Sequence, residues 1–184
     1  SKDFFYNCKS LVKITIHSKS KLILENEIFL CNDKLEEVNL KGSLVIIGDK
    51  CFKDSFTKET YHIYEYYFHR QCSIKIESES YIEFGKNCFE RSNIDKFEIS
   101  GKEIYFKEES FSKCSFLTYF EVLDAVKICI NEFSFKDCDN LNKISLTKIG
   151  FVIIRPKAFI GCTKLLNFNF NFESIYDAWN DFDI

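Results

Sequence analysis

Short runs in which apolar and polar residues alternate recur along the chain at nearly fixed distances. One alternating apolar pair occurs at Ile14/Ile16, Val38/Leu40, Phe97/Ile99, Phe120/Val122, Ile144/Leu146 and Phe168/Phe170. A second pair occurs at Leu22/Leu24, Val45/Ile47, Ile82/Phe84, Ile104/Phe106, Ile128/Ile130 and Val152/Ile154. Alternation with a period of two is the pattern of a strand with one buried face. The pattern therefore predicts two short strands in each repeated unit.

A phenylalanine follows the second pair of each unit at a constant distance. These residues, with a first copy near the N-terminus, are Phe5, Phe29, Phe52, Phe89, Phe111, Phe135 and Phe159, so most steps are 22 to 24 residues. Three positions later comes a small residue: Cys8, Asn32, Ser55, Ser92, Cys114, Cys138 or Cys162. A leucine then follows at Leu11, Leu35, Leu117, Leu141 and Leu165, with Ile94 one place early and Lys58 as a misfit. A unit of this size cannot bury its apolar residues alone, so we expect the units to stack in register.

The unit resembles the BspA-like leucine-rich repeat. The resemblance rests on the motif Phe-x2-Cys-x2-Leu-x2-apolar-x-apolar, on a small residue before the phenylalanine (Ala158 before Phe159), and on seven copies between residues 4 and 170. It implies a curved right-handed solenoid with a parallel sheet on its concave side. It also implies a surface or secreted protein that adheres to host proteins or other cells. The proline common after the family's strand is missing here, and the third unit is interrupted.

The predicted fold class is an α/β leucine-rich-repeat solenoid, rich in β-structure and about seven coils long. Short strands and single helical turns are expected opposite the concave sheet, because linkers such as RPKAF are too short for more and Pro156 suits a first helical turn. The solenoid is expected over residues 1–170. Residues 171–184, which include Trp179, are expected to form a cap or to begin a truncated further repeat. The first coil shows no cap and is predicted to be open, mobile or paired with another molecule.

Composition indicates a folded protein and argues against several functional classes. Hydrophobic residues make up 46% and charged residues 29%, and the formal net charge is −3. A chain so close to neutral lacks the basic footprint of a nucleic-acid-binding protein. No apolar run reaches the roughly 18 residues of a membrane span, and the N-terminal residues lack the layout of a signal peptide.

The nine cysteines are explained mainly by the repeat. Six occupy repeat positions: Cys8, Cys114, Cys138 and Cys162 after the phenylalanine, and Cys51 and Cys88 before it. Such thiols are expected to pack as small buried groups. Cys31, Cys72 and Cys129 remain as candidates for reactivity. His62, His69 and Cys72 are the nearest approach to a metal cluster, but no fourth ligand is evident, so no metal or cofactor is predicted.

Extra residues lie between Phe52 and Phe89, within the stretch 60–80. Two apolar pairs compete to form the first strand of the third unit, Tyr61/Ile63 and Ile74/Ile76. Both pairs can lie in strands if the chain runs out as an extended strand and returns, so that it forms a hairpin that projects from the stack. The stretch is the most aromatic of the chain, with Tyr61, Tyr64, Tyr66, Tyr67 and Phe68 as candidate binding residues. Exposed tyrosines offer a large contact area, so the insertion is a second candidate surface, for a partner or for self-association. The alternative is that these rings pack against the solenoid.

The main candidate surface is the outward side of the first strand in each unit, which a curved solenoid would make concave. Its candidate binding residues are Lys13, Thr15, Glu37, Asn39, Lys96, Glu98, Tyr119, Glu121, Lys143, Ser145, Asn167 and Asn169. Extended concave surfaces are how such solenoids bind partners. The columns are mixed in charge with little aromatic content, and a solvated sheet face would look similar.

Function is therefore predicted to be non-enzymatic protein binding. No nucleophile elbow, phosphate-binding glycine loop or zinc-protease motif occurs. One hypothesis is adhesion or recognition of host or cell proteins at the cell surface or after secretion. Another is an intracellular scaffold in the cytoplasm, favoured by nine thiols that would risk mispairing in an oxidising compartment. A third is a structural spacer that self-associates through the tyrosine-rich insertion.

Overall fold

Strands and turns make up the whole described fold, and the strands of the main sheet are parallel. The computed structural model describes residues 4–57, 62–63, 66–67 and 72–172. The strands are β1 (Lys13–His17), β2 (Lys21–Leu24), β3 (Glu37–Ile47), β4 (His62–Ile63), β5 (Tyr66–Tyr67), β6 (Ser73–Phe84), β7 (Lys96–Ser100), β8 (Glu103–Phe106), β9 (Tyr119–Ile130), β10 (Lys143–Ile154) and β11 (Asn167–Phe172). No helix occurs among these residues, so the fold is β and not α/β.

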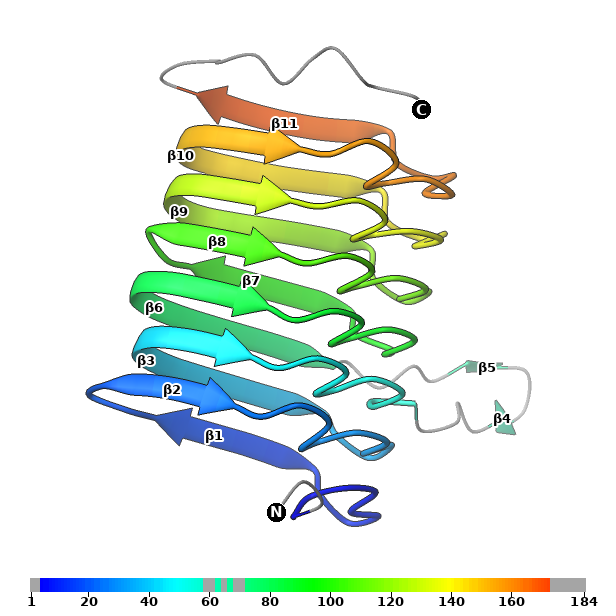
Figure 1. Cartoon of the computed structure of the whole chain (residues 1–184). Coiled ribbons are helices and arrows are strands. Elements are labelled where there is room, and N and C mark those ends of the chain that lie inside the picture. The colour runs from blue at the N-terminus through cyan, green and yellow to red at the C-terminus, as the bar shows by residue number, and fades with distance from the viewer. Residues whose placement is uncertain (1–3, 58–61, 64–65, 68–71, 173–184) are drawn as a thin grey trace.

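Two layers of parallel strands enclose the core (Figure 1). The first layer consists, in order, of β1, the start of β3, the start of β6, β7, the start of β9, the start of β10, and β11. The second layer consists, in order, of β2, the end of β3, the end of β6, β8, the end of β9, and the end of β10. We call the outward sides of these layers the first-strand face and the second-strand face. The predicted parallel sheet and the short strands opposite it are confirmed.

The third side of each coil is a pair of turns and not the predicted helical turn. Residues two places before and two places after each stacked phenylalanine have positive φ, as at Lys50 (53°) and Asp54 (53°) around Phe52. A residue in the left-handed region ends a right-handed helix at once. The amides then bond to the next coil instead: Lys50 N–H donates to the Lys86 carbonyl at 2.9 Å and Phe52 N–H to the Cys88 carbonyl at 2.7 Å.

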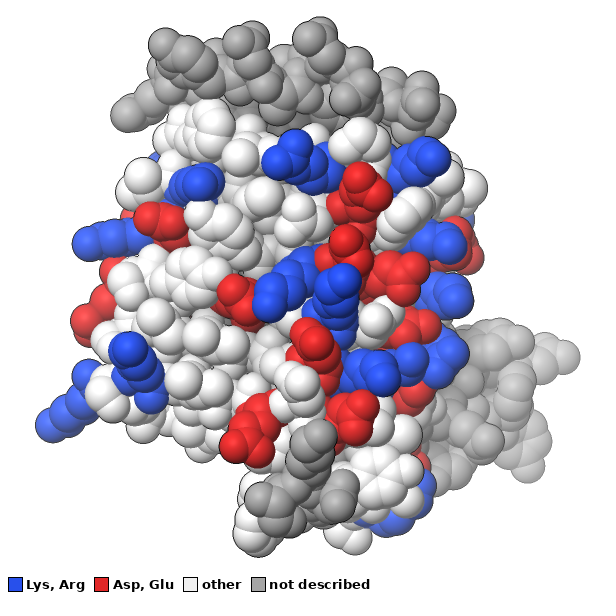
Figure 2. All heavy atoms as spheres, viewed as in Figure 1, with Lys and Arg blue, Asp and Glu red and all other residues white. Residues whose placement is uncertain are grey.

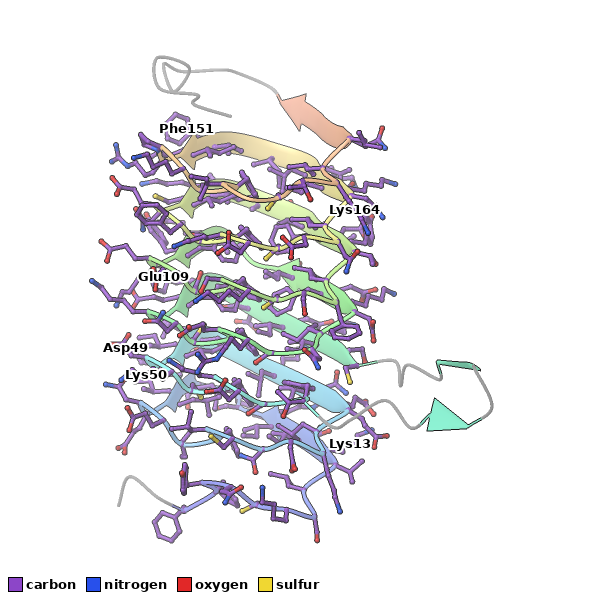
Figure 3. All side chains as sticks on the ribbon, turned by 90° about the vertical axis from the view of Figure 1, so that its right-hand side faces the viewer. Lys13, Asp49, Lys50, Glu109, Phe151 and Lys164 are labelled. Carbon is purple, nitrogen blue, oxygen red and sulfur yellow. The ribbon has the colours of Figure 1, made fainter. Side chains whose placement is uncertain are left out.

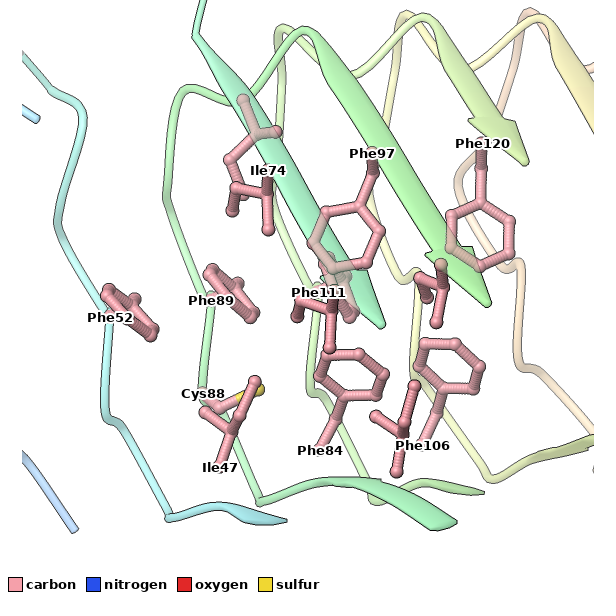
Figure 4. Packing of buried hydrophobic residues seen from close by; sticks show 14 of the residues in the cluster. Ile47, Phe52, Ile74, Phe84, Cys88, Phe89, Phe97, Phe106, Phe111 and Phe120 are labelled. Atoms are coloured by element: carbon pink, nitrogen blue, oxygen red, sulfur yellow. The ribbon is translucent and has the colours of Figure 1, made fainter. Parts of the chain in front are cut away.

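A continuous stack of phenylalanine rings fills the interior beside these turns (Figure 4). Ring centroids of Phe52 and Phe89 lie 5.0 Å apart, those of Phe89 and Phe111 5.0 Å, and those of Phe111 and Phe135 5.3 Å. Phe159 extends the stack at 5.2 Å from Phe135. The prediction that equivalent phenylalanines form one column is confirmed.

The small residue after each phenylalanine donates a hydrogen bond to the previous coil. Cys138 Sγ donates to the Phe111 carbonyl at 3.1 Å and Ser92 Oγ to the Phe52 carbonyl at 2.6 Å. The same bond is made by Asn32, Ser55, Cys114 and Cys162. The position therefore selects a small donor, which explains why cysteine, serine and asparagine replace one another there.

The described residues build about five turns, so the seven expected coils are not confirmed. Within the described ranges, no strand pair precedes the motif around Phe5, and β11 is the one strand that follows the last motif. Residues 171 and 172 belong to β11, and the expected cap from 173 to 184 lies outside the described residues. At the N-terminal end of the stack, β1 is the edge strand of the first layer and pairs with β3.

The strands β4 and β5 of the insertion are not part of the main sheet, and the register of the main sheet is restored in β6. Val38 in β3 pairs with Ile74 in β6, and Leu40 with Ile76, so Ile74/Ile76 is the strand of the third unit. Ile63 instead lies in β4, which pairs antiparallel with β5. Of the two competing registers, the one through Tyr61/Ile63 is wrong for the main sheet, while a hairpin contact is present between β4 and β5.

Candidate protein-binding face

The first-strand face carries the predicted binding residues in two columns. Strand pairing aligns Lys13, Glu37, Ser73, Lys96, Tyr119, Lys143 and Asn167 in one column, and Thr15, Asn39, Lys75, Glu98, Glu121, Ser145 and Asn169 in the other. All twelve residues named from the sequence are among them. Parallel in-register pairing spaces equivalent residues about 4.8 Å apart, so the face repeats at that distance.

Sequence reasoning missed the two residues that β6 contributes to these columns, Ser73 and Lys75. Their neighbour Glu77 continues the same strand. The signal was available, because Ile76 precedes Ile82 by the usual six residues. It was obscured by the insertion, which displaced the strand from its expected distance after Phe52.

At the N-terminal end of this face, charges are paired between neighbouring strands. Lys13 Nζ lies 2.9 Å from Glu37 Oε2, and Asn39 Nδ2 donates to Glu37 Oε1 at 2.6 Å. The hydrogen bond from Lys13, supported by that from Asn39, lowers the pKa of Glu37 below its ordinary value. The Glu37 carboxylate is therefore already satisfied by the protein.

The middle of the face repeats this neutralisation. Glu77 lies 2.6 Å from Lys75 Nζ and 3.0 Å from Lys41 Nζ, and these hydrogen bonds lower its pKa, that from Lys75 most. Lys96 forms an ion pair with Glu98 on its own strand, and the hydrogen bond raises the pKa of Lys96.

Tyr119 organises the C-terminal part of the face. Its hydroxyl donates to Glu121 Oε1 at 2.6 Å, and Lys143 Nζ lies 5.1 Å from the ring centroid. Burial, followed by the bond to Glu121, raises the pKa of Tyr119. Glu98 is the register partner of Glu121, so two carboxylates lie side by side at this point. This pair is the most acidic spot of the two columns.

Chemically, this arrangement suits polar contacts with another molecule. Glu37, Glu77 and Glu98 are paired with lysines, Glu121 accepts from Tyr119, and no group of three or more potential metal ligands occurs among the described residues. Partner groups can bond to the repeated polar side chains without displacing the core. Lys13 on this face and Phe151 on the second-strand face project from opposite sides of the stack (Figure 3).

The tyrosine-rich insertion is described only in part. Tyr66 and Tyr67 form β5. Tyr61, Tyr64 and Phe68 lie outside the described residues, so the second candidate surface stays a prediction. Within the described part of the chain, no helix is long and apolar enough to cross a membrane.

The cysteines left over by the repeat are mostly enclosed. Cys72 is buried, and its Sγ donates to the Leu35 carbonyl at 3.7 Å. Cys129 is 8% exposed and Cys31 is half-buried. Burial raises the pKa of Cys31 and of Cys129, which reduces their reactive thiolate fraction.

Comparison with known proteins gives one family match. The sequence profile described as BspA type leucine rich repeat region matches in six copies, over residues 1–72 and 55–166. No curated protein matches, and no solved structure matches.

Proposed function

The chain belongs to the BspA-type leucine-rich repeat family, and from that membership we propose a protein-binding module that acts in adhesion or protein recognition at a cell surface or after secretion. Repeats of this kind generally bind proteins through extended surfaces and generally carry no catalytic centre. Binding through the first-strand face is the specific proposal, and the tyrosine-rich insertion is its possible extension.

The observation that carries the proposal is the register of the two polar columns. Because Lys96, Tyr119 and Lys143 align across three strands, a partner meets a regular array instead of an isolated residue. The paired carboxylates of Glu98 and Glu121 add an acidic spot within that array, which suits a lysine or arginine of the partner.

Burial of the thiols weakens the argument that favoured the cytoplasmic scaffold. All nine cysteines are free, but six of them are buried. Burial raises the pKa of Cys51 and Cys88, so little thiolate forms at neutral pH, and thiolate is the species that exchanges with disulfides. The risk of mispairing in an oxidising compartment is therefore smaller than the cysteine count suggests.

A binding assay with two panels of purified proteins tests the proposal. The chain is immobilised and exposed to extracellular-matrix proteins and, separately, to cytosolic proteins. We expect saturable binding from the first panel that weakens at least about tenfold in Glu98→Lys/Glu121→Lys, since each added lysine repels a basic partner. Glu108→Lys, at an exposed residue of the turn side, is the control. Binding to the cytosolic panel alone, or equal binding by both variants, would contradict the proposal.

A further inference from the structure

The second-strand face is organised around four residues with an alternating arrangement. β6 presents Tyr81 and Glu83 outward, and β8 presents Glu103 and Tyr105 in register with them, so each tyrosine lies beside a glutamate both along and across the strands. Tyr81 OH donates to Glu83 Oε2 at 2.6 Å, and Tyr105 OH to Glu103 Oε2 at 3.1 Å. The two rings meet along the diagonal at 5.1 Å. We call these four residues the Tyr–Glu quartet.

Apolar side chains lie on both sides of the quartet. Toward the N-terminal end of the stack, the outward residues include Ile23, Leu44 and Ile46, and toward the other end Cys129, Phe151 and Ile153. Ile23 is 57% exposed. Uncharged residues cover much of this face, and many of the charged ones gather toward the turns (Figure 2). In contrast, seven of the fourteen residues in the two columns of the first-strand face are lysine or glutamate.

The outward residues of this face can be compared with those of a second copy of the same face in which the order of the strands is reversed. Counting inward from the two ends, Ile23 corresponds to Ile153 and Ile46 to Cys129. In the middle, Tyr81 corresponds to Glu103 and Glu83 to Tyr105. Two of the six pairs thus join apolar residues, two join a tyrosine to a glutamate, and two join a lysine to an apolar residue, with no two like charges brought together. Such self-complementarity is what a two-fold pair of identical surfaces requires.

We propose that the second-strand face binds a second copy of this chain, with the two-fold axis along the strands and the two stacks antiparallel. Ile23 of one copy then packs on Ile153 of the other, and the two quartets face each other so that each tyrosine ring lies against a glutamate side chain. The two lysines of this face meet apolar groups: Lys127 lies against Leu44, and Lys21 lies against the ring of Phe151. No carboxylate is buried opposite another.

The size of the face sets the strength of the pair. The face has six strands, which lie about 4.8 Å apart. Each strand contributes four residues with a rise of about 3.3 Å per residue. The face therefore measures roughly 29 Å by 13 Å. An area of this order corresponds to weak, transient interfaces that bury less than about 1,200 Å² in total. The pair is a weak dimer, separate from the protein binding assigned to the opposite face.

Sedimentation equilibrium across a wide range of protein concentration tests the pair. Ile23→Glu/Ile153→Glu places carboxylates opposite each other at both ends of the interface, and raises the dimer dissociation constant at least about tenfold. Ile23→Glu/Ile153→Lys places opposite charges in contact and restores much of the loss. Val126→Glu is the matched control, because Val126 is 62% exposed on the bend between the layers.

Each result decides for or against the proposal. Dimerisation that is weakened by the double glutamate variant and restored by the glutamate–lysine variant supports the antiparallel pair. A wild-type chain that stays monomeric up to about 1 mM, where binding is worth only about 4 kcal/mol, overturns it. So does a dimer that the double glutamate variant leaves unchanged, or one that the glutamate–lysine variant fails to restore. Circular dichroism of each variant confirms that the exposed substitutions leave the fold intact.

Discussion

The ring of Phe52 stacks on the ring of Phe89 at 5.0 Å and an interplanar angle of 4°, although the insertion separates them in the chain. Phe29 and Phe52, which belong to an uninterrupted step, stack at 5.1 Å and 11°. The interior of the solenoid is therefore the same with and without the extra residues. Arg91 reinforces the contact by donating to both carboxylate oxygens of Asp54, at 2.6 and 2.8 Å.

Deleting residues 58–70 should preserve the fold. The deletion places Ile74 nine residues after Phe52, the distance that separates Val38 from Phe29. A long surface loop contributes little to stability, because its closure entropy grows slowly with length. We expect a melting temperature within about 5 °C of the wild type, measured by circular dichroism. A variant that lacks 96–100 (β7) serves as the control and should lose the cooperative transition.

Phe111→Ala should be among the most destabilising single substitutions. The side chain is fully buried and its ring contacts those of Phe89, Phe97 and Phe135. Emptying such a site costs about 3–5 kcal/mol in the free energy of unfolding. Phe5→Ala is the matched control, because Phe5 is 44% exposed and stacks on Phe29 at the end of the column. Urea titration that gives equal losses for both would show that the column is not a shared core.

Substitutions of Cys138 should separate its size from its hydrogen bond. Its Sγ donates to the Phe111 carbonyl, as Ser92 Oγ does to the Phe52 carbonyl. Cys138→Ser keeps a donor and should stay within about 1 kcal/mol of the wild type, whereas Cys138→Ala leaves a buried carbonyl unpaired at a cost of about 1–3 kcal/mol. Chemical denaturation measures both. The reverse order would indicate that thiol packing, and not donation, selects this residue.

Alkaline pH should weaken the fold through the buried thiols. Burial raises the pKa of Cys51, Cys88 and Cys138 above the ordinary value of 9.0. Above that value the unfolded chain loses thiol protons that the folded chain keeps, so the unfolded state binds fewer protons and stability falls as pH rises. Each thiol can contribute up to about 1.4 kcal/mol per pH unit.

Cys51→Ala/Cys88→Ala should make this decline shallower. Ala158 fills the same position in another copy, so alanine is compatible with the site. Urea midpoints at pH 8 and pH 10 provide the comparison. If the double variant shows the same decline as the wild type, these two thiols do not couple to unfolding.

The repeat made the stacking predictable from the sequence, because constant offsets between Phe, the small residue and the apolar pairs fix which residues share a column. The turns were not predictable in the same way. Left-handed conformations at Glu27, Lys50 and Glu109 are adopted by residues that are not glycine, so no residue type marks them. Their stability comes from hydrogen bonds to the next coil, which are a property of the assembled stack.

The candidate faces were also predictable from the sequence only in part. Residues 81–84 read Tyr-Ile-Glu-Phe and residues 103–106 read Glu-Ile-Tyr-Phe, so the outward tyrosines and glutamates are visible in the sequence. That they align opposite each other depends on the pairing of β6 with β8. Register, rather than composition, determines what each face offers.

The hydrogen bonds that join one coil to the next run along the axis of the stack, in both strand layers and in the turns. A tensile load applied between the two ends would therefore peel the protein open coil by coil, instead of shearing whole sheets at once. Each rupture would release about 24 residues, or roughly 80 Å of contour at about 3.3–3.6 Å per residue. A tether built in this way yields gradually and dissipates work at every step.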